Sequence, residues 1–206
     1  ALAHNVGLPK GRMKTPAFQA LIKAVDMDEA CNLGRTHLFG LLGKFNEQIA
    51  ELEIWLKQKA APDKKAELLL TQKGVGYLTA LATVHTLGDV SRFAKVSKQV
   101  IGFAGFDPLE SSSAGKIRFG RISKAGSALL RFQLGQAAQM AARSDVKLKS
   151  FYKRLAKKKP KAVAKTATAR KLLVKLSIML RDHITAQEFD RRGQAVGNAR
   201  KSQGLQ

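Results

Sequence analysis

Several residue types are scarce in this sequence, and each scarcity excludes a class of protein. A single cysteine, Cys31, rules out an intrachain disulfide and is typical of a protein from a reducing cytoplasm. The four histidines are scattered and share no metal-ligand spacing with Cys31, so the sequence predicts no metal site. No apolar run approaches the roughly 18 residues that a membrane-crossing helix needs, and no signal-like start or lipidation motif is visible. No membrane partner is therefore expected.

Acidic residues are also scarce, with 15 Asp and Glu against 37 Lys and Arg and a formal net charge of +22. The imbalance is concentrated in one half of the chain. Residues 1–109 carry 14 basic and 10 acidic side chains, whereas residues 110–206 carry 23 and 5. So uneven a distribution is typical of a protein that binds a polyanion. In the absence of any membrane signal, the sequence indicates nucleic acid as the partner.

The hydrophobic pattern predicts an all-α fold, and no stretch has a convincing strand pattern. We expect an irregular segment over 1–16, a helical coiled-coil arm over 17–60, a compact basic helical domain over 64–183 and a flexible basic tail over 184–206. Because the chain starts at an alanine in mid-pattern, we expect it to be a fragment or a processed form of a longer protein.

The predicted arm carries an apolar seam with heptad spacing. Its members follow one another at intervals of 4, 3, 4, 3 and 4 residues, which is typical of a coiled coil over nearly three heptads. A coiled-coil arm would join protomers, whereas an amphipathic helix with the same pattern would pack inside its own domain, and the pattern alone allows both. The seam consists of Leu38, Leu42, Phe45, Ile49, Leu52 and Leu56.

A glycine turn separates two predicted helices near the start of the basic domain. Lys73 stands directly before Gly74-Val75-Gly76, an arrangement that resembles a helix-hairpin-helix. In that motif the backbone N–H groups of the turn bind phosphate oxygens without reading base sequence. The alternative is an ordinary glycine connection between two core helices.

The most informative stretch is a serine cluster followed by basic residues. Ser111, Ser112 and Ser113 lead into Ala114-Gly115, small residues that allow a ligand to approach the backbone closely. The basic residues that follow could hold phosphate while a serine hydroxyl acts as nucleophile. The alternative is a polar surface loop that binds nucleic acid and performs no chemistry. The predicted phosphate-binding residues are Lys116, Arg118, Arg121, Lys124 and Arg131.

Three strings in this order resemble one known family. They are LTQKGVGYLTALATVHTLGDVSRF, IGFAGFDP and SSAGKIRFGRISKAGSALLR, and the heptad arm and PKAVAKTATARKLL extend the similarity over most of the chain. Together they resemble the C-terminal domain of the insertion-sequence transposases related to the Piv DNA invertase (the IS110 type). Ala114 stands where the most similar branch of that family has a glycine.

The resemblance implies a DNA recombinase guided by a structured RNA and acting as dimers that pair into a tetramer in a bacterial or archaeal cytoplasm, at the nucleoid. A serine of the loop would form a covalent phosphoserine link to DNA, and Ser113 fits that position best, with Ser112 as the alternative. Mg²⁺ would be bound by four acidic residues of a separate ribonuclease-H-like domain outside this chain. The chain alone is then expected to bind nucleic acid without cutting it.

Two other functions are compatible with the residues. One is a non-catalytic helix-hairpin-helix module that binds DNA or RNA through a basic face, and the other is a structural RNA binder of the ribosomal type. Both explain the charge, but neither requires the Ser-Ser-Ala-Gly loop. Loss of strand exchange on removal of one hydroxyl, with binding retained, would separate the recombinase from both.

Overall fold

The computed structural model describes residues 15–113 and 116–193, and for residues 111–113 and 116–119 it describes the backbone alone. Spatial proximity along the backbone divides the chain into two units, Ala1–Trp55 and Leu56–Gln206. Each unit is described by itself.

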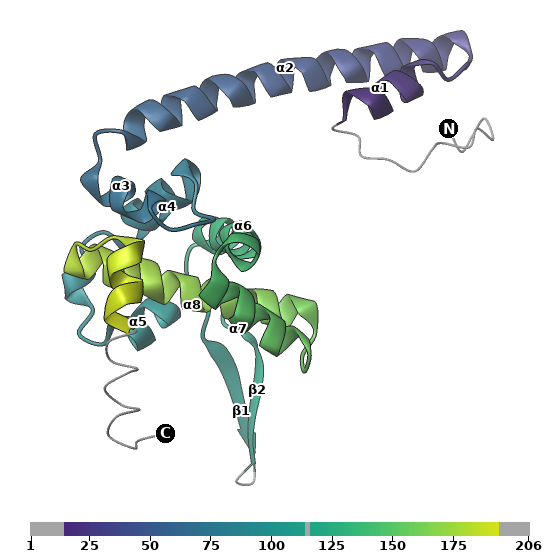
Figure 1. Ribbon diagram of the computed structural model, residues 1–206. Coiled ribbons are helices and arrows are strands. Elements are labelled where there is room, and N and C mark those ends of the chain that lie inside the picture. Colours follow the sequence, from purple (N-terminus) through teal and green to yellow (C-terminus); the bar gives the residue numbers. More distant parts are fainter. Residues whose placement is uncertain (1–14, 114–115, 194–206) are drawn as a thin grey trace. The chain divides into compact units, whose positions relative to one another are not determined.

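The first unit contains α1 (Pro16–Lys23) and most of α2 (Glu29–Ala60) (Figure 1). Asp28 caps α2, since its carboxylate accepts a hydrogen bond from the Cys31 N–H at 2.7 Å. The turn between the helices is fixed by Arg35, whose guanidinium donates to the carbonyls of Ile22 and Val25. The hydrogen bond and the negative charge of Asp28, with some burial, raise the pKa of the Cys31 thiol, which favours the unreactive form.

Four of the six residues in the apolar seam of α2 are exposed. Leu38 is 68% exposed, and Phe45, Ile49 and Leu52 are more than half exposed as well. The continuous helix from Glu29 confirms the long predicted helix. The other two seam residues, Leu42 and Leu56, are half-buried, and Leu56 packs against the core of the second unit. Large exposed apolar stripes of this kind mark interaction surfaces. Trp55, on the same helix, is 52% exposed.

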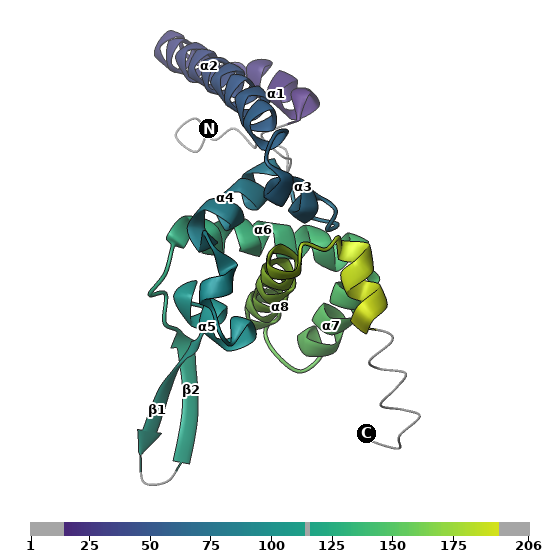
Figure 2. The ribbon, with the colours of Figure 1, turned by 90° about the vertical axis from the view of Figure 1, so that its left-hand side faces the viewer.

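The second unit is a helical body with one hairpin (Figures 1 and 2). The helices of this unit lie within and beside the predicted helical domain over 64–183. Asp63 caps α3, and its carboxylate accepts hydrogen bonds from the Lys65 and Ala66 N–H groups. A mainly helical fold is therefore confirmed. Its elements are α3 (Lys64–Leu70), α4 (Tyr77–Leu87), η1 (Val90–Arg92), α5 (Val96–Phe103), β1 (Pro108–Ser113), β2 (Lys116–Ile122), α6 (Ala128–Ser144), α7 (Val146–Ala156) and α8 (Lys161–Asp182).

Helix α8 is the centre of this body. It contacts α3, η1, α5, α6 and α7. Helices α5, α6 and α7 lie around it in Figure 2. Its buried residues recur every three or four positions, as the periodicity of the sequence predicts. Leu172, Leu173, Leu176 and Met179 are completely buried and form the middle of the apolar core. The helices around α8 are thus held by the burial of its apolar side chains.

The hairpin of β1 and β2 corrects the expectation that no strands are present. The strands pair antiparallel, with Ser113 opposite Lys116 and Pro108 opposite Ile122, and an irregularity follows Pro108. The hairpin extends away from the helices (Figures 1 and 2). The serine cluster thus lies on a strand, although the sequence pattern predicts a loop. Pairing with β2 provides hydrogen-bond partners for the backbone N–H and C=O groups of β1.

The structure describes the first part of the expected tail, up to residue 193. Residues 186–193 are helical, and Ile184 and Ala186 are buried in the core of the second unit. The Ala186 N–H donates to the Thr71 hydroxyl at 3.0 Å. Apolar burial and this hydrogen bond order the segment, although its composition is mainly polar. The tail residues 194–206 lie outside the described part of the chain.

Candidate functional site

The serine cluster and its first basic residues face one another across the hairpin. By register, Ser113 pairs with Lys116 and Ser111 with Arg118, whereas Ser112 pairs with Ile117. Opposite residues of an antiparallel pair share a face, and faces alternate along each strand. Ser111 and Ser113 therefore share a face with the two basic positions, and Ser112 lies on the other face. The loop residues Ala114 and Gly115 lie outside the described residues.

The base of the hairpin is fastened by Asp107 and Ser123. The Ser123 hydroxyl donates to the Asp107 carboxylate, and the Ser123 N–H donates to the Asp107 carbonyl at 2.8 Å. Next to them, the Lys124 N–H donates to the Gly105 carbonyl at 3.1 Å. These contacts join the FDP and RISK strings, which the sequence alone does not connect. They fix where the hairpin leaves the helical body.

Two glycines let the chain segments at this base approach closely. A Cβ on Gly126 would lie 2.1 Å from the Phe103 carbonyl oxygen, and one on Gly105 would lie 2.6 Å from the Ala125 nitrogen. Gly105 also has a positive φ of 70°, a conformation that favours glycine. Both glycines therefore have a packing role at the root of the hairpin.

The predicted phosphate-binding cations differ in their surroundings. Arg121 and Lys124 are exposed, whereas Arg131 is half-buried and Nη1 of its guanidinium donates to the carbonyls of Ala104 and Gly126 at 3.1 and 2.6 Å. This contact gives Arg131 a structural role, and its predicted contact with nucleic acid stays a prediction. Lys116 and Arg118 are defined by their backbone positions on β2 alone.

The glycine turn lies at a different part of the second unit. Gly74 has a φ of 92°, and a Cβ there would lie 2.4 Å from the Ala141 nitrogen, near the end of α6. The hairpin base lies at the start of α6, so about 20 Å of helix separates the two features at 1.5 Å per residue. The structure therefore does not bring the predicted turn residues Lys73, Gly74 and Gly76 together with the serines.

The outer half of the turn is open. Gly76 is the N-cap residue of α4, no side chain caps the free N–H groups there, and a Cβ on Gly76 would meet nothing within 4 Å. Lys73 is exposed. Uncapped N–H groups beside a lysine can bind a phosphate. The helix-hairpin-helix interpretation remains a prediction.

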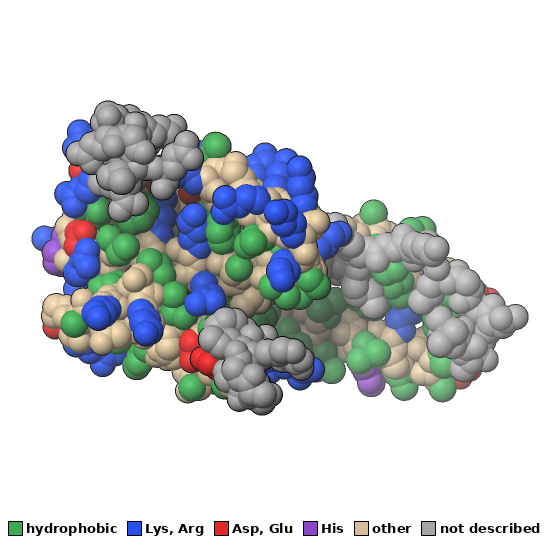
Figure 3. All heavy atoms as spheres, turned by 90° about the horizontal axis from the view of Figure 1, so that it is seen from below, with side chains coloured by type: hydrophobic (Ala, Val, Ile, Leu, Met, Phe, Trp, Pro, Cys, Tyr) green, Lys and Arg blue, Asp and Glu red, His purple; other side chains and the backbone are tan. Residues whose placement is uncertain are grey.

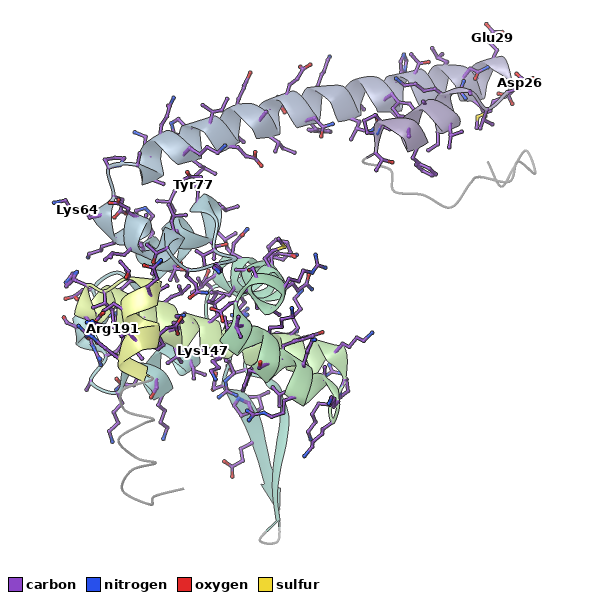
Figure 4. All side chains as sticks on the ribbon, in the orientation of Figure 1. Asp26, Glu29, Lys64, Tyr77, Lys147 and Arg191 are labelled. Carbon is purple, nitrogen blue, oxygen red and sulfur yellow. The ribbon has the colours of Figure 1, made fainter. Side chains whose placement is uncertain are left out.

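A partly buried polar network contacts the glycine turn through Gln72. Asp145 caps α7 through the Leu148 N–H and accepts from Gln72 Nε2 at 3.0 Å, while Lys175 Nζ lies 3.7 Å from its carboxylate. Lys175 also pairs with Asp190 at 3.0 Å, and Asp190 in turn pairs with Lys147. Lys147 lies at the start of α7 (Figure 4). The network thus joins the turn, α7, α8 and the C-terminal helical segment.

The charge state of Asp145 follows from this network. Burial raises the pKa of its carboxyl group, but the hydrogen bonds from Gln72 and from the Leu148 and Lys147 N–H groups, with the charge of Lys175, outweigh that effect. The net pKa lies below the usual range. Asp145 is therefore ionised at neutral pH despite its burial.

Positive charge dominates the surface around the hairpin. On the face of the body seen in Figure 3, Lys and Arg side chains are spread widely and acidic side chains are few.

In the described ranges no group of three or more His, Cys, Asp or Glu side chains is placed to hold a metal ion. Asp26 and Glu29 lie at the α1–α2 turn (Figure 4). None of the helices described is long and apolar enough to cross a membrane.

Comparisons with known proteins agree with these features. Residues 66–153 match the family described as Transposase IS116/IS110/IS902 family, a range that runs from α3 into α7 and includes the hairpin. The chain is 36% identical over 94 residues to a transposase for insertion sequence element IS1111A from Coxiella burnetii, covering 46% of this chain and 26% of that protein.

Two further relatives have similar names. A transposase for insertion sequence element IS1328 from Yersinia enterocolitica is 36% identical over 105 residues (51% of this chain, 31% of that protein). A probable family 20 transposase from Pseudomonas aeruginosa is 31% identical over 96 residues (47% of this chain, 28% of that protein). The matches thus span between a quarter and a third of each curated relative. The resemblance noted in the sequence is confirmed for residues 66–153, which match the IS116/IS110/IS902 transposase family.

Proposed function

We propose that this chain is the part of a DNA transposase that supplies the serine nucleophile for strand cleavage, and that Ser113 is that nucleophile. The observation that carries the proposal is the family match over residues 66–153, which includes the hairpin with its serine cluster. The register favours Ser113, because it shares a face with the basic positions Lys116 and Arg118, whereas Ser112 shares its face with Ile117.

The step is a transesterification. The Ser113 oxygen forms a bond to the phosphorus of a DNA phosphodiester, and the bond from phosphorus to one DNA oxygen breaks. The serine proton ends on the leaving oxygen, so the products are a phosphoserine ester and a DNA hydroxyl, and no oxidant or reductant is needed. Arg121 and Lys124, exposed at the base of the hairpin, would neutralise charge on the non-bridging oxygens.

Mg²⁺ does not fit the residues described here. Glu110 is the only acidic residue between Pro108 and Arg143, and the described residues hold no cluster of metal ligands. We therefore assign the metal expected for this family, together with its acidic ligands, to a domain of the parent protein outside this chain. The step above is written with the residues of this chain alone.

The partners belong to the same proposal. DNA is the substrate, a structured guide RNA would select the site by base pairing, and protomers would associate through the exposed seam of α2 as a dimer that assembles to a tetramer. The support for association is the exposure of Leu38, Phe45, Ile49 and Leu52 along one helix. The chain without its acidic partner domain would bind nucleic acid and leave it uncut.

Covalent capture tests the proposal. Labelled DNA, Mg²⁺ and guide RNA are incubated with the full-length transposase carrying Ser113→Ala, Ser112→Ala or Ser111→Ala, and adducts are separated on a denaturing gel. We expect the adduct to disappear only in Ser113→Ala, with DNA binding unchanged. Ser111→Ala is the matched control, since Ser111 shares the same face of the hairpin.

Two results would overturn it. Loss of the adduct in Ser112→Ala alone would make Ser112 the nucleophile. Absence of any adduct in every protein, with tight binding retained, would favour the second candidate, a non-catalytic helix-hairpin-helix module. The observation favouring that candidate is the open, uncapped N-terminus of α4 beside Lys73.

A further inference from the structure

Three adjoining hollows form one groove along the first half of α8. Their volumes are about 660, 350 and 370 Å³, and Ala162 lines all three. Lys165 lines the first two, and Thr166 the second and third. The groove starts at Arg121 and Lys124, where the hairpin joins the body, and ends between α6 and α7. We refer to this surface as the α8 groove.

The lining of the α8 groove is basic and contains no acidic residue. The ion pairs within the described residues involve basic side chains outside the groove, such as Lys147, Lys175 and Arg181. Neighbouring positive side chains without acidic partners repel one another, and a bound anion relieves this repulsion. The cations beyond the hairpin end are Arg143, Lys149, Lys153, Lys161, Lys165 and Arg170.

The start of α8 strengthens this conclusion. Pro160 precedes the helix, no side chain caps its first N–H groups, and its first turn has no acidic residue. Lys161 instead places positive charge at the positive end of the helix dipole, which disfavours the helix, and Lys165 follows one turn later. A phosphate bound beside Ala162 would satisfy the free N–H groups and both lysines at once.

Tyr152 indicates which form of nucleic acid fits. It is half-buried in the largest hollow, with Lys149 and Lys153 beside it. A tyrosine in a basic groove provides a stacking surface for an unpaired base, whereas the bases of a duplex are already stacked on one another. Sites of this composition bind single strands with little sequence preference.

We propose that the α8 groove binds one single strand of nucleic acid, with phosphates on Lys161 and Lys165 and a base stacked on Tyr152. This proposal rests on the proposed function in one respect: the strand in the groove would be a continuation of the nucleic-acid strand bound at the hairpin. The ligand chemistry is a phosphodiester chain with exposed bases, which either the DNA or the guide RNA can supply.

The test compares two doubly substituted proteins. Lys161→Gln with Lys165→Gln removes two groove cations, and Lys157→Gln with Lys158→Gln removes two exposed lysines that do not line the groove. Fluorescence anisotropy measures binding of labelled single-stranded DNA, single-stranded RNA and duplex DNA over a salt series. We expect the groove pair to lose about tenfold or more in affinity for single strands. Its salt slope should fall by about 1.4, at roughly 0.7 per phosphate contact.

Tyr152→Ala should weaken single-strand binding by about 5- to 100-fold, and Tyr152→Phe should retain it, because only the ring is needed for stacking. Whichever single-stranded probe, DNA or RNA, binds with the higher affinity identifies the source of the strand. Equal losses in the two lysine pairs, or unchanged binding in Tyr152→Ala, would overturn the proposal. A failure of covalent capture with the groove effects intact would refute the serine nucleophile and leave the groove proposal unaffected.

Discussion

At the scale of single residues, polar contacts between residues far apart in the sequence hold the elements of the second unit together. Gln72 and Asp145 are 73 positions apart, and Asp107 and Ser123 are 16 apart, yet each pair is joined by a hydrogen bond. No local pattern in the sequence predicts such pairs, because each depends on how the helices pack. The capping role of Asp63 could be predicted, since it depends on its immediate neighbours alone.

Asp145→Asn tests the buried network. The folded-state pKa of Asp145 is lowered, so its charge contributes stability that is present above the unfolded pKa of about 3.9 and is lost as the pH falls through the folded value. We expect the substitution to reduce the free energy of unfolding by about 1–3 kcal/mol at pH 7 and by less near pH 3. Urea unfolding at the two pH values measures the difference, with exposed Asp26→Asn as control. A loss independent of pH would refute the charge-based explanation.

Gly74→Ala and Gly76→Ala form a matched pair in the glycine turn. Gly74 has a positive φ and no space for a Cβ beside Ala141, so the substitution should cost about 2 kcal/mol or more of unfolding free energy. Gly76 has a φ of −103° and open space, so its substitution should change stability by less than about 1 kcal/mol. Thermal unfolding followed by circular dichroism distinguishes them. Equal effects would show that the packing of Gly74 on α6 is not what requires glycine.

At the scale of elements, the helices could be predicted and the hairpin could not. Helices have local signals, such as the periodic apolar residues of α8 and the caps of α3 and α7. The strand β1 reads PLESSS, which lacks the β-branched and aromatic residues typical of strands. A signal was present in β2, where Lys116, Ile117, Arg118 and Phe119 alternate basic and apolar residues with a period of two.

The exposed seam of α2 predicts self-association. Phe45→Glu with Ile49→Glu places two charges on the seam and should weaken association by at least about tenfold, since an apolar pairing cannot bury them. Gln48→Glu with Lys44→Glu changes charge off the seam and should have a small effect. Sedimentation velocity over a concentration series gives the dissociation constants. Monomeric behaviour of the unsubstituted chain at all concentrations would exclude a coiled-coil arm.

At the scale of the whole molecule, the charge asymmetry along the sequence reappears as a surface property. Basic side chains after residue 109 line the α8 groove, which begins where the hairpin joins the helical body. The total charge could be read from the sequence, and with it the class of partner. The groove could not be predicted, because its lining comes from β1, β2, α6, α7 and α8 and exists only once these elements are packed.

Binding to nucleic acid should depend steeply on salt. If the chain contacts about six phosphates, its affinity should fall about 10³-fold between 50 and 200 mM monovalent salt. Anisotropy titrations with an oligonucleotide measure the slope, and an oligonucleotide with a neutral methylphosphonate backbone is the control. Salt-independent binding would exclude the phosphate backbone as the main contact.

The position of Trp55 gives the molecule a natural optical probe. It is the chain's only tryptophan, and it lies half-exposed on α2. Its fluorescence emission therefore reports the polarity around this helix, and it does not line the α8 groove. A second helix packed on the seam should shift the emission to shorter wavelength as the protein is concentrated. An oligonucleotide in the groove should leave the wavelength unchanged, so one unlabelled sample can separate pairing of the arm from occupation of the groove.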